Sequence, residues 1–195
     1  MALDTQLERG IALKIFKDFT TKYNAGNIAI ELKKTRAGTL KALKNLEKKR
    51  IVIGEAIGKA RIYKLNLADD FVKKNIELLL EEEARTRQRW INEFEELSKK
   101  AEILILFGSI IRDEKKAHDL DLLIVLDTKQ NKEIDNMIND KNNILTKRIH
   151  PVKQTKGDLT NNLKKHDKVL LNALKFGIVL HGYKQIVDMI ENVTR

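Results

Sequence analysis

The segment LFGSIIRDEKKAHDLDLLIVLD, residues 106–127, joins two apolar runs through a polar loop. The loop opens with the small residues Gly108 and Ser109 and closes on two aspartates, Asp119 and Asp121. An extended strand points alternate side chains to the same face, so both carboxylates share a face at roughly 6.6 Å along the chain. Two such charges repel each other unless a cation lies between them. The pattern therefore predicts a cation site at the start of a buried strand.

A hard divalent cation suits this pair, because Mg²⁺ binds one or two carboxylates together with substrate phosphates. Gly108 permits close approach of a ligand to the backbone. Ser109 adds a hydroxyl at a turn whose N–H groups can face a phosphate, and Arg112 adds a positive charge from the same loop. These features predict a site for a metal–nucleotide complex. The plainer alternative is a surface turn whose acids cap a strand end.

The whole arrangement resembles the DNA polymerase beta-type nucleotidyltransferase superfamily, most closely its small prokaryotic members. Its parts are an apolar strand, Gly-Ser, a loop with an arginine, Asp-x-Asp and a second apolar strand. The resemblance covers residues 101–195, including FGIVLHGYKQIVDMIE. It implies Mg²⁺ or Mn²⁺ as cofactor and a nucleoside triphosphate as ligand. By resemblance, the catalytic and metal-binding residues are Asp119 and Asp121, and the nucleotide-binding residues are Gly108, Ser109 and Arg112.

One feature of that superfamily is missing from the sequence. Active members carry a third acid on the next strand, where it helps to deprotonate the attacking hydroxyl and to hold a second metal. The strand predicted over residues 144–154 has no Asp or Glu, and its alternation favours Arg148, over Lys147, for the vacant place. Asp127 precedes this strand and Asp158 follows it. The nucleotide-holding site thus looks intact, whereas the catalytic metal site looks incomplete.

A different pattern covers the first third of the chain. Helical spacing of apolar side chains extends over residues 5–23, 27–32 and 37–49. The following segment, RIVIGEAIGKARIYKLNL, predicts a β-hairpin that bends at IGKA. This order resembles winged helix-turn-helix domains of prokaryotic regulators over residues 10–67. The resemblance implies binding to double-stranded DNA, with the second helix of the pair in the major groove.

Positive charge is concentrated in the same part of the chain. Residues 1–70 hold 15 Lys and Arg against 8 Asp and Glu, a net charge of +7, whereas the rest hold 23 against 20. A basic excess suits a polyanionic partner. In the second helix, Leu40, Leu43 and Leu46 are predicted to be buried. The predicted nucleic-acid contacts are Thr35, Arg36, Thr39, Lys41, Lys44, Lys59 and Arg61. The alternatives are an ordinary solvated face and a winged fold that serves as a dimerisation module.

Together the patterns predict a two-domain protein with both helices and sheet, of the α+β/α/β class. Its expected parts are a winged helix-turn-helix domain at 1–68, a connecting helix at 69–100 and a nucleotidyltransferase-like mixed sheet with flanking helices at 101–195. No cysteine is present, no apolar run reaches the roughly 18 residues of a membrane span, and the first residues lack a signal-peptide pattern. A cytoplasmic protein without membrane contact is therefore expected.

Three functions follow as hypotheses. The first is transfer of a nucleoside monophosphate from an NTP to a hydroxyl of a nucleic acid or protein. The second is a DNA-binding regulator whose degenerate transferase domain senses nucleotide, binds a protein partner or forms a homodimer. The missing third acid favours this second function. The third rests on family members that act as antitoxins and adenylylate a helical toxin partner.

Overall fold

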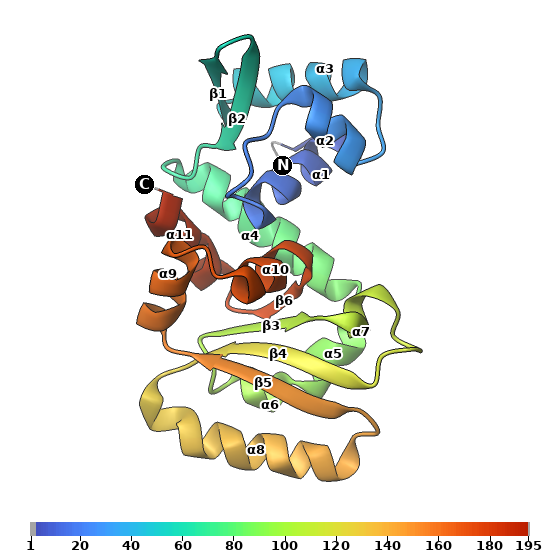
Figure 1. Ribbon diagram of the computed structural model, residues 1–195, viewed down its shortest axis with the longest axis vertical. Helices are drawn as coiled ribbons and strands as arrows, with labels where there is room; N and C mark the ends of the chain where they lie inside the picture. Colours follow the sequence, from blue (N-terminus) through green and yellow to red (C-terminus); the bar gives the residue numbers. More distant parts are fainter. Residues whose placement is uncertain (1–2, 195) are drawn as a thin grey trace. The chain divides into compact units, whose positions relative to one another are not determined.

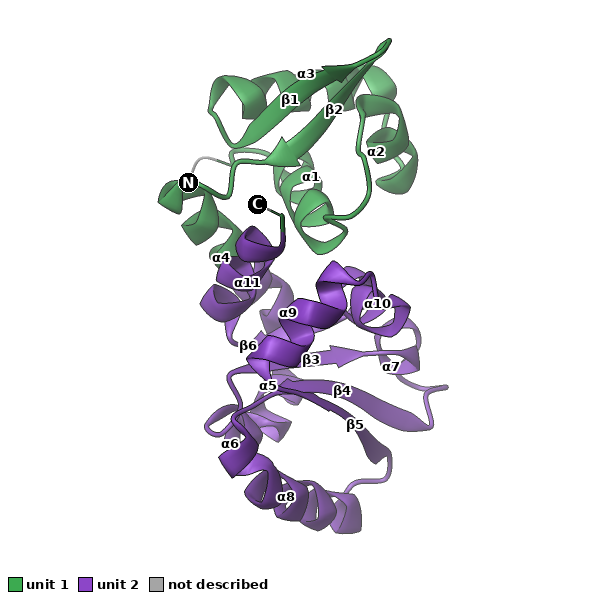
Figure 2. Cartoon of the chain, turned by 60° about the vertical axis from the view of Figure 1, so that its left-hand side comes forward, with its two compact units in different colours: residues 1–79, 194 green, residues 80–193, 195 purple. Residues whose placement is uncertain are grey.

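The computed structural model describes residues 3–194, which divide into two compact units (Figures 1 and 2). The division falls between Leu79 and Leu80. The first unit consists of helices and a β-hairpin, and the second contains a four-stranded mixed sheet with flanking helices. Within residues 3–194, no helix is both long enough and apolar enough to cross a membrane.

Three helices open the first unit: α1 (Gln6–Lys17), α2 (Ala25–Glu31) and α3 (Arg36–Lys48). Each begins after a polar side chain that accepts a hydrogen bond from a backbone N–H of the first turn. These caps are Thr5, Asn24 and Thr35. Such caps satisfy N–H groups that have no partner inside the helix. The first helix ends six residues before Tyr23, so the predicted helix over 5–23 is too long.

The predicted hairpin is confirmed. Strands β1 (Val52–Ile57) and β2 (Ala60–Leu65) pair antiparallel, and Gly58 in the turn between them has a φ of 58°. Tyr23 pairs with Tyr63 of β2 as an isolated antiparallel bridge, which explains why the chain is extended there.

Helix α3 faces the core differently from the prediction. Its buried residues are Thr39, Ala42, Leu43 and Leu46, whereas Leu40 is 38% exposed. The buried set follows the i, i+3, i+4, i+7 spacing of one helical face, and Leu40 lies outside it. The predicted nucleic-acid contact at Thr39 is therefore wrong, because its side chain is fully buried.

The buried Thr39 hydroxyl gives a stability prediction. No hydrogen-bond partner for its Oγ1 exists among the described residues, and an unpaired buried hydroxyl costs about 1–3 kcal/mol. Thr39→Val keeps the shape of the side chain and should raise the free energy of unfolding by about 1 kcal/mol, measured by urea denaturation. Thr35→Val is the matched control on the same helix. It removes a hydroxyl that accepts a bond from the Gly38 N–H and should destabilise by about 1 kcal/mol. Equal effects of the two substitutions would contradict this account.

The predicted single helix over residues 69–100 is three helices: α4 (Asp70–Arg85), α5 (Gln88–Glu93) and α6 (Glu95–Ser98). The chain leaves helical geometry at Arg87 and again at Phe94. Both Trp90 and Phe94 are buried, and their rings stack with centroids 6.0 Å apart. The two rings are buried where the chain breaks between α4, α5 and α6. The periodicity of apolar residues does not reveal these breaks.

The sheet of the second unit has the order β5-β4-β3-β6 (Figure 1). Its strands are β3 (Ile103–Phe107), β4 (Asp119–Val125), β5 (Arg148–Gln154) and β6 (Ile178–His181). Strand β3 pairs antiparallel with both β4 and β6, whereas β4 and β5 are parallel. The remaining elements are α7 (Ser109–Arg112), a 3₁₀ helix η1 (Thr128–Gln130), α8 (Asn131–Ile144), α9 (Lys156–Lys164), α10 (Lys168–Phe176) and α11 (Tyr183–Thr194). The predicted mixed sheet with flanking helices is thus present.

Packing on one sheet face sets how β4 and β5 align. Leu120 and Leu122 of β4, Ile149 of β5 and Ile138 of α8 belong to one buried cluster. Leu120 pairs with Ile149 across the two strands. Since side chains alternate along a strand, the residues on either side of these apolar positions point to the opposite face.

Candidate active site

Asp119 and Asp121 lie at the start of β4, on the sheet face opposite that of Leu120. Both are partly exposed, while Leu123 and Val125 further along the same face are fully buried. The face is therefore covered along most of the strand and accessible only where the two carboxylates lie. A ligand can reach them without any change in the core.

Gly108 places the preceding turn directly against these carboxylates. Its φ is 82°, a conformation that L side chains rarely adopt. A Cβ atom at this position would lie 2.0 Å from Asp121 Oδ2. The next residue, Ser109, begins α7, and its hydroxyl lies 3.5 Å from Asp119 Oδ1 as a long hydrogen-bond donor. The predicted turn and the predicted acids therefore form one site.

Burial raises the pKa of Asp121 above its ordinary value, and the neighbouring charge of Asp119 raises it further. His150 acts in the opposite direction and lowers it. The two carboxylates thus repel each other, as their spacing predicts. A bound cation would relieve this repulsion, so the residues present fit a divalent metal.

His150 is the residue of β5 that lies beside the two aspartates. It is paired in register with Asp121, and its Nδ1 lies 3.4 Å from Asp119 Oδ2. Arg148, the residue predicted for the place of the third acid, is paired in register with Asp119, but the basic group that contacts the Asp119 carboxylate is the His150 imidazole. Lys147 instead donates a hydrogen bond to the carbonyl of Ala117. The alternation along β5 was correct, but its register against β4 was not readable from the sequence.

Neither of the other two candidate acids is available as a third carboxylate. The Asp127 side chain accepts a hydrogen bond from the Lys129 N–H at the start of η1. Asp158 forms a capping box with Thr155 at the start of α9, which lowers the pKa of its carboxyl. Among the residues that the structure describes, the cluster able to hold a metal consists of Asp119, Asp121 and His150.

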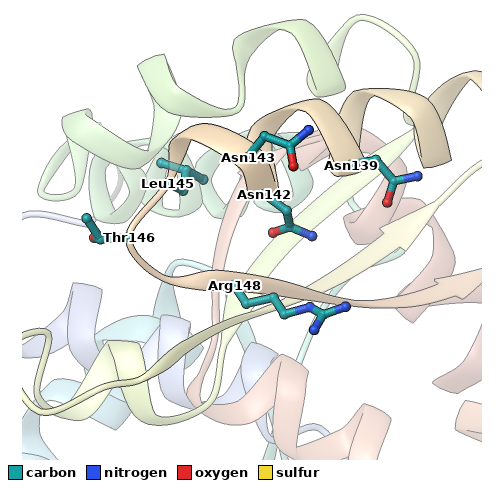
Figure 3. A pocket seen from close by; sticks show the side chains of 6 residues that line it. All are labelled: Asn139, Asn142, Asn143, Leu145, Thr146 and Arg148. Atoms are coloured by element: carbon teal, nitrogen blue, oxygen red, sulfur yellow. The ribbon is translucent and has the colours of Figure 1, made fainter.

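Arg148 lines a polar pocket of about 450 Å³ between α8 and β5 (Figure 3). The other lining residues are Asn139, Asn142, Asn143, Leu145 and Thr146. The Asn142 amide oxygen accepts a hydrogen bond of 2.7 Å from the Ile149 N–H, which ties α8 to β5. Sequence reasoning missed this pocket, since the run of asparagines carries no motif of its own.

Arg112 is the last residue of α7 and is exposed. The described residues include no ion-pair partner for it, so its guanidinium is available to an anionic ligand. Its position on the Gly108–Ser109 side of the loop is consistent with its predicted role as a phosphate contact.

Most of the predicted nucleic-acid contacts of the first unit are exposed. Arg36, Lys41 and Lys44 lie on α3, and Lys59 lies in the hairpin turn. Thr35 is exposed but its hydroxyl serves as the cap of α3. Arg61 forms an ion pair with Glu47. The Glu47 carboxylate already neutralises the guanidinium, so Arg61 is less available to a phosphate.

A family model for the nucleotidyltransferase domain matches residues 87–187. The match covers more than half of the chain and includes the turn, both aspartates and His150. The chain therefore belongs to the nucleotidyltransferase domain family, a DNA polymerase beta-like class. No curated protein and no solved structure showed significant similarity to it. The family indicates nucleotide transfer with a nucleoside triphosphate as donor.

Proposed function

We propose that the chain binds a nucleoside triphosphate together with a divalent cation and transfers the nucleoside monophosphate to a hydroxyl acceptor. The observation that carries the proposal is the contact of Gly108 with Asp121. It brings a glycine turn against a pair of carboxylates at the one accessible end of a buried strand. In the family, a turn of this kind holds phosphates beside the metal ligands.

Each side chain has a distinct part in this proposal. Asp119 and Asp121 hold the cation, which when bound neutralises charge on the triphosphate. The N–H groups and the hydroxyl at Gly108 and Ser109 orient the phosphates. Arg112 supplies a further positive charge. The half-buried surroundings of the carboxylates strengthen these interactions relative to bulk water.

The histidine in place of a third acid limits the expected rate. A carboxylate there would help to accept the proton of the attacking hydroxyl, and such assistance is typically worth about 10²–10⁴-fold. His150 leaves the site without this third carboxylate. The proposed activity is therefore slow, and nucleotide binding without efficient transfer is the second candidate function.

The experiment is incubation of the full-length protein with radiolabelled NTPs, Mg²⁺ or Mn²⁺ and a panel of nucleic-acid and protein acceptors. We expect slow transfer by the wild-type chain and an increase of about 10²-fold in His150→Asp. Rapid transfer by the wild type would show that the third acid is dispensable. NTP binding with no transfer by either protein would contradict the transfer activity and support the second candidate function, nucleotide binding.

We further propose that the first unit is a winged helix-turn-helix that binds duplex DNA. The supporting observation is the exposed basic surface of α3 and the hairpin turn, formed by Arg36, Lys41, Lys44 and Lys59. The order of three helices and a hairpin is that of a winged domain. The structure nonetheless places Thr39 in the core, so base contacts would come from the remaining exposed residues.

For this DNA-binding proposal we expect a strong dependence of affinity on salt. If about six phosphates are neutralised, the slope of log affinity against log salt is about −5 for the full-length protein. Arg36→Ala and Lys41→Ala should each weaken binding more than Lys132→Ala, an exposed lysine on α8. Fluorescence anisotropy with a labelled duplex measures both quantities. A flat salt response would indicate a protein-contact module instead.

A further inference from the structure

His150 reaches the two aspartates from a different strand, across the register of β4 and β5. One ligand atom from each of Asp119, Asp121 and His150 lies within 4.8 Å of the other two. The His150 side chain is 54% exposed and that of Asp119 is 36% exposed, so both can reach a shared ion. The three groups therefore form a mixed set of two oxygen donors and one nitrogen donor.

We propose that His150 is a third metal ligand and that it makes the site select a first-row transition-metal ion, such as Mn²⁺ or Co²⁺, over Mg²⁺. This inference rests on the proposed metal–nucleotide site and names the kind of ion that the site takes. It concerns ion choice and does not depend on which acceptor is used.

Donor chemistry is the first reason. Mg²⁺ requires oxygen ligands in near-octahedral geometry. Imidazole nitrogen binds first-row transition-metal ions more readily than it binds Mg²⁺ or Ca²⁺, which take oxygen ligands. A site with a nitrogen donor in the third place therefore gains affinity for transition metals and gains little for Mg²⁺.

Charge is the second reason. A third carboxylate would add a negative charge that attracts a hard cation, and a neutral imidazole adds none. The remaining negative charge comes from Asp119 and Asp121. Without the charge of a third carboxylate, the affinity for Mg²⁺ falls most. Mg²⁺ binding relies on ligand charge and retained water, and Mg²⁺ gains little from a nitrogen ligand.

The contact between His150 and Asp119 is longer than a tight ion pair. Its 3.4 Å separation exceeds the roughly 2.7–2.9 Å of a charge-assisted hydrogen bond. Asp119 is approached on its other oxygen by Ser109, and Asp121 is held against Gly108. The two carboxylates are thus positioned by the turn, while the imidazole remains free to turn toward an ion.

The test titrates the metal-free, full-length protein with Mg²⁺, Mn²⁺ and Co²⁺ by calorimetry, without nucleotide. Later transition metals bind more tightly at most sites, so the decisive comparison is between variants for each ion. His150→Ala should weaken Mn²⁺ and Co²⁺ binding by at least about tenfold, with little change for Mg²⁺. His150→Asp should instead strengthen Mg²⁺ binding. His166→Asn, which removes an exposed histidine elsewhere, should leave all three unchanged.

Pulsed electron paramagnetic resonance gives a direct readout on the Mn²⁺ complex. The wild type should show coupling of the ion to an imidazole nitrogen, and His150→Ala should lose it. Absence of that coupling, or equal Mn²⁺ and Co²⁺ affinities in wild type and His150→Ala, would overturn the proposal. A second titration, with NTP added in the presence of each ion, separates the two proposals. If NTP still binds with Mg²⁺ when the His150 test fails, only the role of His150 fails. If NTP fails to bind with any ion, the proposed function fails as well.

Discussion

Replacing both Asp119 and Asp121 with asparagine is expected to abolish cation-dependent binding of NTP. The double variant removes both negative charges that hold the cation while keeping the size of the side chains. Calorimetry with Mg²⁺ or Mn²⁺ and an NTP measures the effect. Since every interaction of the cation with these carboxylates is lost, we expect a drop in affinity of at least about 100-fold, or about 2.8 kcal/mol.

The fold should survive this change. Burial and Asp119 raise the pKa of Asp121, so its charged form destabilises the folded protein at neutral pH. That penalty disappears as the pH falls through the raised pKa toward the ordinary value of 3.8. The metal-free double variant should therefore be at least as stable as the wild type at pH 7, with a smaller difference in acid.

Asp140→Asn is the control for the double variant, because it removes an exposed acid of α8 away from the turn. It should leave NTP affinity unchanged. Wild-type NTP affinity in the double variant, with the fold verified by circular dichroism, would show that the site has been assigned to the wrong residues.

Gly108→Ala is expected to have the second largest effect. The added Cβ would lie 2.0 Å from Asp121 Oδ2, so the carboxylate or the turn must move. The Gly108 backbone, with φ of 82° and ψ of −151°, lies in a region that is essentially restricted to glycine, and alanine there adds strain of about 1–3 kcal/mol. Displacement of one metal ligand should reduce cation-dependent NTP affinity by at least about tenfold, or about 1.4 kcal/mol, measured in the same titration.

Gly58→Ala separates the clash from the backbone strain. Gly58 has a φ of 58°, and a Cβ there would meet nothing within 4 Å. This variant should lose about 1–2 kcal/mol of stability from the strain with NTP affinity unchanged. If Gly108→Ala bound NTP as well as Gly58→Ala does, close packing of the turn on Asp121 would not matter for the site.

Local patterns were enough for several features of this protein. Alternation along β4 placed Asp119 and Asp121 on one face, and the turn chemistry placed Gly108 before them. The β1–β2 hairpin was also readable, because strand periodicity and turn residues act over a few neighbouring positions. The mixed sheet was expected from the family resemblance. The residues that decide these features are close together in the sequence, so a short segment is enough to predict them.

Other features depended on contacts between distant residues. The burial of Thr39 and the exposure of Leu40 follow from which face of α3 meets its neighbours, and two adjacent faces were compatible with the sequence. The break of the 69–100 segment accompanies the burial of Trp90 and Phe94. Helical periodicity alone is the same whether a helix is continuous or broken.

The sequence by itself determined that two carboxylates meet a glycine turn at the mouth of a buried strand. Only the tertiary structure placed His150 beside them. Strands β4 and β5 are separated by α8, so their relative alignment is a nonlocal property. Packing of Leu120 against Ile149 in the core sets that alignment, since a shift by one residue would turn the apolar side chains to the opposite face. With that register in place, His150 pairs with Asp121 and Arg148 pairs with Asp119, and the His150 imidazole is the basic group that contacts the Asp119 carboxylate.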